Sequence, residues 1–262
     1  MRTNLNGEIP AAIAKGALKL RRLWDNPQMA EPFVPFGAAH CSAIALGFAV
    51  PLGLAGLTRQ HIALDKPVRW LLAGLIVANR ILWLVLIEKE GWVSAQNLLP
   101  MHLCDWASIA AAITLLWPNQ RSYELAYFWA FSGTLQAMLT PELAVDFPDL
   151  RFIIFFVSHC TVIASVLYLT LARGMRPYPS SLPRVAAGSL VYTALAIAIN
   201  AFAGTNFGYL RHKPFTPSVL DYLAPWPWYI LEMVAIGIVS LLIYYAPFFI
   251  ADLLRRRRAA HI

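Results

Sequence analysis

The chain has 262 residues, of which 59% are hydrophobic and only 13% are charged, and its mean hydropathy is +0.57. Soluble domains carry about 25% charged residues, so this composition excludes an ordinary soluble domain and places the chain in the membrane class. The formal net charge of +7 does not indicate nucleic-acid binding. The basic residues cluster at the ends of apolar runs, as in "RRRR" at 255–258, where they act as topology signals.

The N-terminal region, residues 1–36, differs from the rest of the chain. Its first thirty residues contain no long apolar core, so no cleavable secretory signal is predicted. The segment Ile9–Trp24 is basic and amphipathic. It either lies on an anionic membrane surface or forms a short helix that packs on the remainder. Residues 37–262 are predicted to form a single transmembrane domain.

Seven apolar runs in this domain are close to the roughly 20 residues that a spanning helix needs. They predict an all-α, polytopic membrane bundle of about seven transmembrane helices. The predicted spans lie near 37–57, 68–87, 98–117, 122–140, 150–172, 183–204 and 228–252. The longest connection, 205–228, is rich in aromatic residues and proline, and we expect it to form an ordered cap at the membrane interface.

Orientation follows from the distribution of Lys and Arg, which favour the cytoplasmic side. Arg255–Arg258 predict a cytoplasmic C-terminus in a multi-pass protein of the cell membrane. The basic connections 58–67 and 173–184 fall on the same side, and the acidic connection 141–149 falls outside. The basic N-terminal segment would lie outside and conflicts with this orientation.

Cys104 and His159 lie inside predicted spans at similar depths. Counted from the outer ends of their spans, Cys104 is roughly 10 Å and His159 roughly 13 Å below the outer surface. Polar groups inside spans are costly and usually face the bundle interior, where they mark a functional site. Whether the two helices touch depends on the tertiary structure.

Other polar and aromatic side chains belong to the same outer half, and they suggest a vestibule that opens outward. The candidate substrate-binding residues are His102, Asp105, Gln136, Asn200, Asp221, Trp226, Trp228 and Glu232. Trp226 and Trp228, in "PWPWY", also fit an interfacial aromatic belt. Arg80 lies near the middle of a span and needs a counter-charge, for which Asp105 is the candidate partner in an ion pair.

The residue types allow nucleophilic catalysis. A cysteine attacks as the thiolate, and a nearby histidine can take its proton, so Cys104 and His159 form a candidate catalytic pair. Asp105 or Asp221 could orient the imidazole. The alternative is structural, because a buried cysteine often packs and a histidine often hydrogen bonds across helices.

Metal binding has little support in the spacing of possible ligands. No HExxH or CxxC motif is present, so no metal site and no cofactor are predicted. Haem held by two imidazoles from His40, His102 and His159 is a further hypothesis.

Several strings between Leu98 and Trp228 resemble the YwaF-type family of bacterial integral membrane proteins. They are "LPMHLCDWASI", "YELAYFWAFSGTLQAMLTPEL", "FPDLRFIIFFVSH", "LYLTL" with "RPYP", "GTNFGYL" and "LDYLAPWPWYI". That family is similar to the eukaryotic transmembrane protein 164 family, whose members are described as lysophospholipid acyltransferases with a membrane-embedded Cys and His. The resemblance implies that Cys104 carries the acyl group and that His159 is the base. The region up to Ser94 shows no such resemblance.

The leading functional hypothesis is therefore acyl transfer or ester hydrolysis on a lipid in the outer half of the membrane. Membrane lipids and an acyl substrate are the expected partners. Cys104 would attack the acyl ester, and His159 would accept and return the proton. The groups that would orient the substrate or stabilise the oxyanion are Asp105, Gln136, Asn200 and Asp221. The alternative is a transporter or receptor that binds a small polar or lipid ligand in the vestibule.

Overall fold

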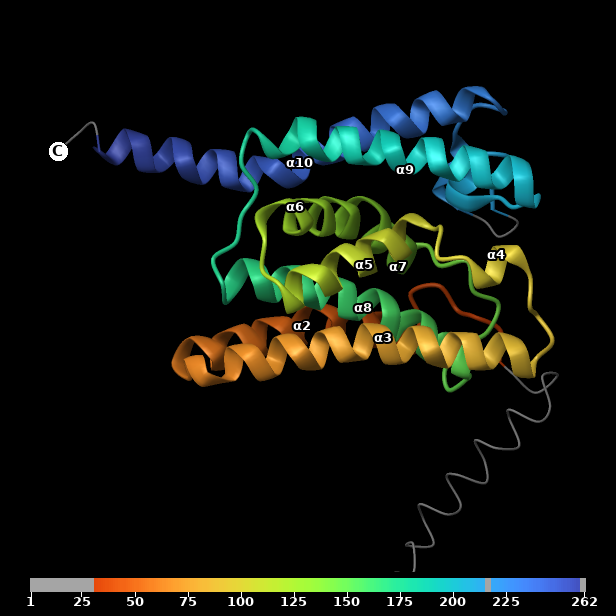
Figure 1. Ribbon diagram of the computed structural model, residues 1–262, viewed down its shortest axis with the longest axis horizontal. Helices are drawn as coiled ribbons and strands as arrows, with labels where there is room; N and C mark the ends of the chain where they lie inside the picture. Colours follow the sequence, from red (N-terminus) through yellow and green to blue (C-terminus); the bar gives the residue numbers. More distant parts are fainter. Residues whose placement is uncertain (1–30, 215–217, 260–262) are drawn as a thin grey trace, which may run out of the picture.

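The computed structural model describes residues 31–214 and 218–259, and these residues form an all-α bundle (Figure 1). The long helices are α2 (Ala38–Gln60), α3 (Asp65–Lys89), α8 (Leu150–Leu171), α9 (Ser181–Ala203) and α10 (Trp228–Ala259). The shorter helices are α4 (Ala95–Leu98), α5 (Leu103–Leu116), α6 (Gln120–Trp129) and α7 (Leu135–Leu139). A π-helical turn, η3 (Ala130–Thr134), joins α6 to α7, and 3-10 turns occupy Ile62–Leu64, Phe207–Tyr209 and Val219–Tyr222. The predicted fold class is confirmed.

The described part of the chain contains six segments that are long and apolar enough to cross a membrane. They are Ala38–Gln60, Ile62–Lys89, Ala95–Leu116, Leu150–Leu171, Ser181–Ala203 and Trp228–Arg258. The remaining predicted span, 122–140, corresponds to the helical segment Gln120–Leu139, which the π turn interrupts. The predicted amphipathic segment Ile9–Trp24, and with it most of the N-terminal region 1–36, lies outside the described residues.

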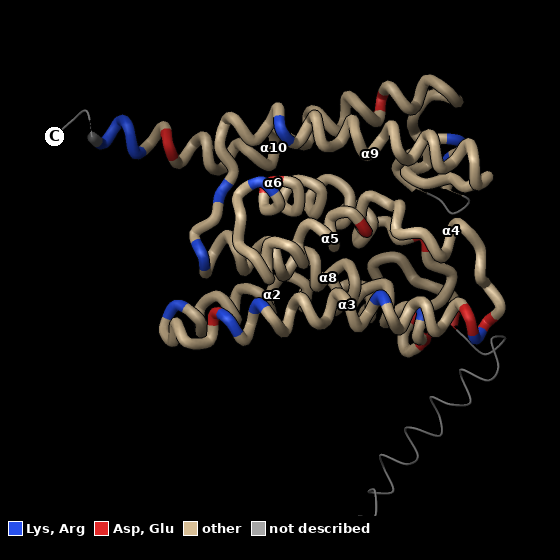
Figure 2. Tube along the Cα trace, in the orientation of Figure 1, with Lys and Arg blue, Asp and Glu red and all other residues tan. Residues whose placement is uncertain are grey.

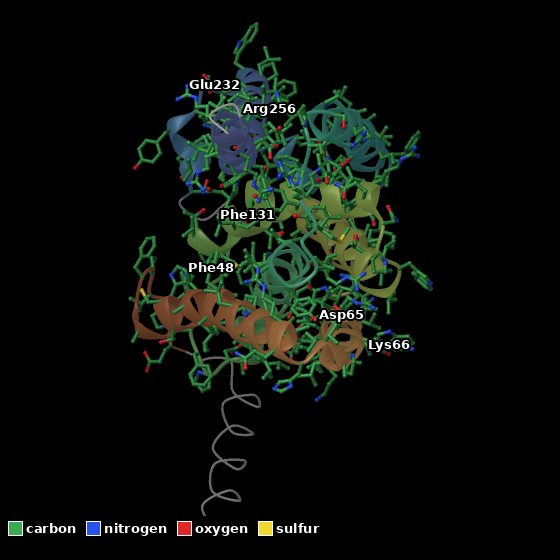
Figure 3. The ribbon with its side chains drawn as sticks, turned by 90° about the vertical axis from the view of Figure 1, so that its left-hand side faces the viewer. Phe48, Asp65, Lys66, Phe131, Glu232 and Arg256 are labelled. Atoms are coloured by element: carbon green, nitrogen blue, oxygen red, sulfur yellow. The ribbon has the colours of Figure 1, made fainter. Side chains whose placement is uncertain are left out.

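The helices are stacked in three layers (Figures 1 and 3). Helices α2 and α3 form one outer layer, marked by Asp65 and Lys66 in Figure 3. The central layer contains α5, α6 and α8, and the opposite outer layer contains α9 and α10. In the apolar stretch of α8, 67% of the residues are buried. In that of α10, only 6% are buried. A helix that is apolar on all sides can occupy a bundle centre, as α8 does, or face lipid.

The outer layers expose large apolar side chains. On α9, Phe202 is 93% exposed and Leu190 is 70% exposed, and α10 carries a continuous apolar surface over 233–243. Apolar surface of this extent is unfavourable in water but favourable in a lipid bilayer. The structure is therefore that of a multi-pass membrane protein.

Charge is distributed unequally between the two ends of the bundle (Figure 2). One end, where α2, α8 and α10 finish, collects basic residues, and the opposite end carries most of the acidic ones. The basic residues are Arg59, Lys66, Arg121, Arg173, Arg176, Arg184 and Arg255–Arg258. The acidic residues include Glu31, Glu88, Glu90, Glu142, Asp146, Asp149, Asp221 and Glu232, and the same end also carries Lys89, Arg151, Arg211 and Lys213. We refer to these as the basic end and the acidic end.

Asp65 joins several elements at the basic end. Its Oδ2 atom lies 3.0 Å from Arg69 Nε and 3.0 Å from Arg173 Nη1. Its Oδ1 atom accepts a hydrogen bond of 3.2 Å from the Tyr168 hydroxyl. Because Asp65 begins α3 and Tyr168 lies near the end of α8, this carboxylate connects an outer helix to the central one.

Two further ion pairs attach the outer layer of α9 and α10. Arg184 of α9 donates from Nε and Nη2 to the two carboxylate oxygens of Glu124 on α6, at 2.8 and 2.7 Å. Arg176, which precedes α9, makes a similar pair with Asp252 of α10. The polar contacts thus hold the layers together at the end where the apolar surface stops.

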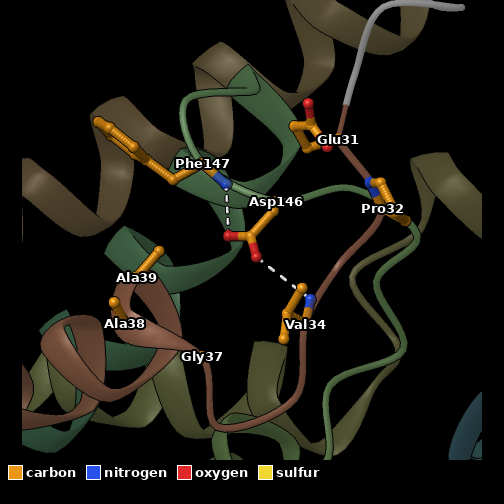
Figure 4. A pocket seen from close by; sticks show the side chains of 8 residues that line it. All are labelled: Glu31, Pro32, Val34, Gly37, Ala38, Ala39, Asp146 and Phe147. Atoms are coloured by element: carbon orange, nitrogen blue, oxygen red, sulfur yellow. Dashed lines mark hydrogen bonds between the residues drawn. The ribbon is translucent and has the colours of Figure 1, made fainter.

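At the acidic end, residues 31–37 lie against the connection between α7 and α8. Asp146 N donates to Glu31 O at 2.9 Å, and Val34 N donates to Asp146 Oδ2 at 3.1 Å. A hollow of about 390 Å³ lies between the two segments (Figure 4). The other oxygen of Asp146 accepts from Phe147 N at 2.6 Å. This carboxylate therefore holds the backbone of the two segments together.

Candidate functional site

Cys104 lies in the first turn of α5, at the acidic end. Asp105 is the third residue of this helix, and its Oδ2 accepts a hydrogen bond of 3.0 Å from His102 N. The contact satisfies a backbone donor at the start of the helix. Cys104 is half-buried, and its carbonyl accepts a 2.8 Å hydrogen bond from Ser108 Oγ. Asp105 therefore fixes the turn that carries the thiol.

Arg80 of α3 reaches the same region without pairing directly with Asp105. Its guanidinium donates to the Leu98 carbonyl, and within residues 31–214 and 218–259 no ion pair joins it to Asp105. The predicted direct ion pair is not formed, because the carboxylate of Asp105 turns back onto the start of its own helix. Arg80 nevertheless lies within electrostatic range of Asp105 and His102.

Gln96 determines the state of the His102 imidazole. Asn206 N donates to Gln96 Oε1 at 2.7 Å, so the amide nitrogen of Gln96 faces His102 Nε2 at 3.0 Å. An amide NH₂ group only donates, so Nε2 must accept, and the proton of neutral His102 is on Nδ1. The ring is enclosed by Phe207 and Tyr209, with centroid distances of 5.1 and 6.3 Å.

His159 lies in α8 with its side chain turned into the bundle, and it is 7% exposed. Its Nδ1 lies 2.7 Å from the Phe155 carbonyl, and its ring stacks on that of Phe155 at 4.1 Å. A carbonyl only accepts, so Nδ1 carries the proton and Nε2 carries the lone pair. Helix α5 packs against α8, and His102 lies within electrostatic range of His159.

The connection after α9 folds into a cap over His102. Asn200 donates to Phe207 O at 2.9 Å and accepts from Phe207 N at 2.7 Å, which fixes the start of the cap. Gly208 and Tyr209 both have left-handed backbone angles, with φ of 66° and 54°. For a residue other than glycine this conformation costs about 1–3 kcal/mol, so surrounding contacts must hold Tyr209 in place.

The Tyr209 hydroxyl supplies one of these contacts, because it donates to Glu142 Oε2 at 2.7 Å. Glu142 belongs to the connection between α7 and α8, so the bond ties the cap to a second loop. Burial, followed by the hydrogen bond and charge of Glu142, raises the pKa of the Tyr209 phenol. The phenol therefore stays protonated and acts as a donor. The Cys104 thiol lies within electrostatic range of it.

Three buried hydroxyl groups, those of Ser132, Thr134 and Tyr192, have no hydrogen-bond partner among the described residues. Ser132 and Thr134 belong to the π turn, a feature that often occurs at functional sites. Gly133 lies between them, and an ideal Cβ there would be 3.0 Å from Leu103 Cδ2. Glycine therefore allows the π turn to approach the residue that precedes Cys104.

The remaining predicted substrate contacts lie mainly in the cap, where most of them bind backbone groups. Asp221 accepts from Ser218 N at 2.8 Å, Glu232 accepts from Ala224 N at 2.8 Å, and Trp226 Nε1 donates to Leu210 O at 3.3 Å. Trp228 is exposed, and Gln136 is exposed on α7 with a 3.4 Å hydrogen bond to Thr140. The described contacts of these residues do not include Cys104 or His159. Their contact with substrate stays a prediction.

His40, considered above as a haem ligand, has a structural role. Its Nδ1 accepts from Phe36 N at 2.8 Å, and its Nε2 donates to Met138 O at 2.7 Å. Both ring nitrogens are therefore occupied by the backbone, which leaves no lone pair for a metal. Across the part of the chain that the structure describes, no three His, Cys, Asp or Glu residues are grouped as metal ligands.

The sequence model of the TMEM164 family matches residues 35–245, which is most of the chain. The chain belongs to the TMEM164 family. A protein described as uncharacterized, from Treponema pallidum (strain Nichols), is 28% identical to this TMEM164-family chain over 229 residues. The alignment covers 82% of the chain and 90% of the relative. No solved structure matches the chain. The family match begins well before Leu98, where the resemblance seen in the sequence starts.

In this TMEM164-family protein, the sequence interpretation missed Gln96, Tyr192 and Tyr209. Gln96 precedes the apolar run of its span, and the two tyrosines look like ordinary apolar or interfacial residues. The available signal was the presence of Asn206 and Gly208 in one short connection, because asparagine and glycine favour turns. No local pattern indicates that the turn closes over His102.

Proposed function

We propose that this protein transfers acyl groups between membrane lipids, or hydrolyses a lipid ester, with Cys104 as the nucleophile and His159 as the general base. The observation that carries the proposal is the state of His159. Its Nδ1 proton is held by the Phe155 carbonyl, and its Nε2 has no hydrogen bond to any described residue. A buried neutral imidazole with a free Nε2 lone pair is suited to accept a proton.

The surroundings of Cys104 support the same role. The thiol is half-buried, and because burial disfavours the thiolate, the cysteine needs a base before it can attack. Helix α5, which carries Cys104 in its first turn, packs on α8, the helix that carries His159. Membership of the TMEM164 family adds support, since the resemblance noted above implies a Cys and His mechanism.

The proposed reaction has two half-reactions. First, His159 Nε2 takes the thiol proton, the Cys104 sulfur bonds to the ester carbonyl carbon, and the carbon–oxygen bond to the leaving alcohol breaks. That alcohol takes the proton from Nε2, which leaves a thioester on Cys104. Second, an acceptor alcohol or water gives its proton to Nε2 and attacks the thioester. The thiol is thereby restored. A lysophospholipid is the proposed acceptor, and Arg80, which lies within electrostatic range of Cys104, is the proposed partner of its phosphate.

A trap for the acyl-enzyme tests this proposal. We expect the purified protein, incubated in phosphatidylcholine vesicles with lysophosphatidylcholine and quenched in acid, to carry an acyl adduct on Cys104 that hydroxylamine removes. Mass spectrometry of the Cys104 peptide is the measurement. Cys160→Ala should keep the adduct, because the Cys160 thiol packs against α2 and donates to Ala43 O. Cys104→Ala should lose both adduct and transfer. Binding of the lipids without any adduct or transfer in the wild type would instead support the ligand-binding alternative.

The charge asymmetry supports an orientation with the basic end in the cytoplasm of the cell. Cys104 would then open toward the outer leaflet. We expect a fluorescent protein fused after Ile262 to fluoresce, and alkaline phosphatase inserted in the connection 141–149 to be active. Each reporter works on only one side of the membrane. Inactive phosphatase together with a dark C-terminal fusion would reverse the orientation and place the candidate site on the inner leaflet.

A further inference from the structure

Tyr192 of α9 carries a buried hydroxyl that has no hydrogen-bond partner among the residues the structure describes. The side chain is only 6% exposed, and no described residue accepts or donates a hydrogen bond at its hydroxyl. A buried hydroxyl left unpaired costs about 1–3 kcal/mol. Tyrosine hydroxyls in protein interiors usually find a partner, so the position of this group requires an explanation.

The tyrosine ring is held among residues that flank Cys104. It packs in a small buried cluster with Met101 and Phe207. The partly buried side chains of Leu103 and Trp106 pack against this cluster. The Trp106 and Tyr192 rings meet edge to face at 5.6 Å. Because Leu103 and Trp106 stand on either side of Cys104 in the chain, the ring lies beside the first turn of α5.

The hydroxyl points toward the cap. An ideal Cβ at Gly208 would lie 3.0 Å from the Tyr192 oxygen, so glycine is what allows the backbone of the cap to come this close. The same oxygen lies within electrostatic range of the Cys104 thiol and the Asp105 carboxylate. The hydroxyl is therefore confined between the cap and the turn that carries the proposed nucleophile.

We propose that the Tyr192 hydroxyl donates a hydrogen bond to the carbonyl oxygen of the acyl group that Cys104 attacks. This inference rests on the proposed function. When the sulfur–carbon bond forms, the carbonyl π electrons move onto the oxygen, and the resulting oxyanion accepts the hydrogen bond from the phenol. When the carbonyl re-forms and the leaving alcohol departs, the phenol keeps its proton. Tyr192 would thus be a further catalytic residue, which acts on the oxygen while Cys104 acts on the carbon.

Tyr192→Phe separates this role from a structural one, because the substitution removes only the unpaired hydroxyl. We expect the rate of thioester formation in a single turnover to fall about 10²–10³-fold, as for loss of one oxyanion donor. We expect the lipid concentration for half-maximal rate to change little. Because no hydrogen bond is lost, the thermal midpoint in detergent should stay the same or rise.

Tyr123→Phe is the matched control. Tyr123 is as deeply buried, but its hydroxyl is hydrogen bonded to Thr170 Oγ1 at 2.7 Å. We expect this variant to lose stability and to keep its rate, the opposite of Tyr192→Phe. A Tyr192→Phe variant with wild-type rate would overturn the inference and leave the hydroxyl as the partner of a trapped water. A rate loss matched by an equal loss of folded protein would also overturn it. Retained activity in Cys104→Ala would instead refute the proposed function, independently of Tyr192.

Discussion

His159→Gln is expected to fold and to lose acyl transfer about 10²–10⁴-fold, the contribution of a general base. Glutamine is similar to histidine in length and polarity, so the variant keeps a polar side chain of similar size at this buried position. It has no basic nitrogen, so the thiol proton has no acceptor. The measurement is the initial rate of lipid product formed per folded protein, with folding assessed by size-exclusion chromatography.

His40→Gln is the corresponding control at a histidine outside the candidate site. His40 is fully buried between Phe36 and Met138, where both of its ring nitrogens are hydrogen bonded. We expect this variant to be less stable but equally active per folded molecule. If His159→Gln retained the wild-type rate, His159 would not be the base, and its Nε2 lone pair would not be the acceptor of the thiol proton.

Asp65→Ala is expected to cause the largest loss of stability. The side chains of Asp65 and Arg69 are 9% and 11% exposed, and the carboxylate also receives Arg173 and the Tyr168 hydroxyl. Removing it leaves two guanidinium groups without their carboxylate, and breaking a buried pair from one side costs about 3–5 kcal/mol. SDS titration in mixed micelles measures the free energy of unfolding.

An acidic residue in a more exposed pair provides the comparison. Asp252 of α10 also pairs with an arginine, Arg176, but its side chain is 35% exposed, and solvent screens such pairs. We expect Asp252→Ala to reduce the unfolding free energy much less than Asp65→Ala does. Equal effects of the two substitutions would show that Asp65 does not connect α3 to α8 in the membrane.

The predicted spans agree well with the helices, but their internal structure does not follow from hydropathy. The span near 98–117 contains a break, since α4 ends at Leu98 and α5 begins at Leu103. The span near 122–140 contains the π turn Ala130–Thr134. Hydropathy averages over a whole window, so it detects the length of an apolar run and misses a local change in hydrogen bonding. These two irregular places lie beside Cys104.

Individual site residues were harder to predict than spans. Asn200 was correctly recognised as a polar residue inside a span, but its amide holds the backbone of Phe207. Asp105 was expected to pair with Arg80 and instead caps its own helix. In both cases the side chain is held by a backbone group within seven residues along the chain. A contact with a residue close along the chain costs less ordering of the chain than a contact with a distant one.

The sequence by itself determined that the chain is a bundle of membrane helices, and it predicted similar depths for Cys104 and His159. Both conclusions depend on hydrophobicity and helical rise, which are properties of a single segment. Only the tertiary structure decided which groups meet. It showed that Gln96 sets the His102 proton, that the cap closes over His102, and that the Tyr192 hydroxyl has no partner among the described residues. These contacts depend on the direction in which each side chain leaves its helix and on which helices are neighbours. Neither is encoded in the composition of any one span.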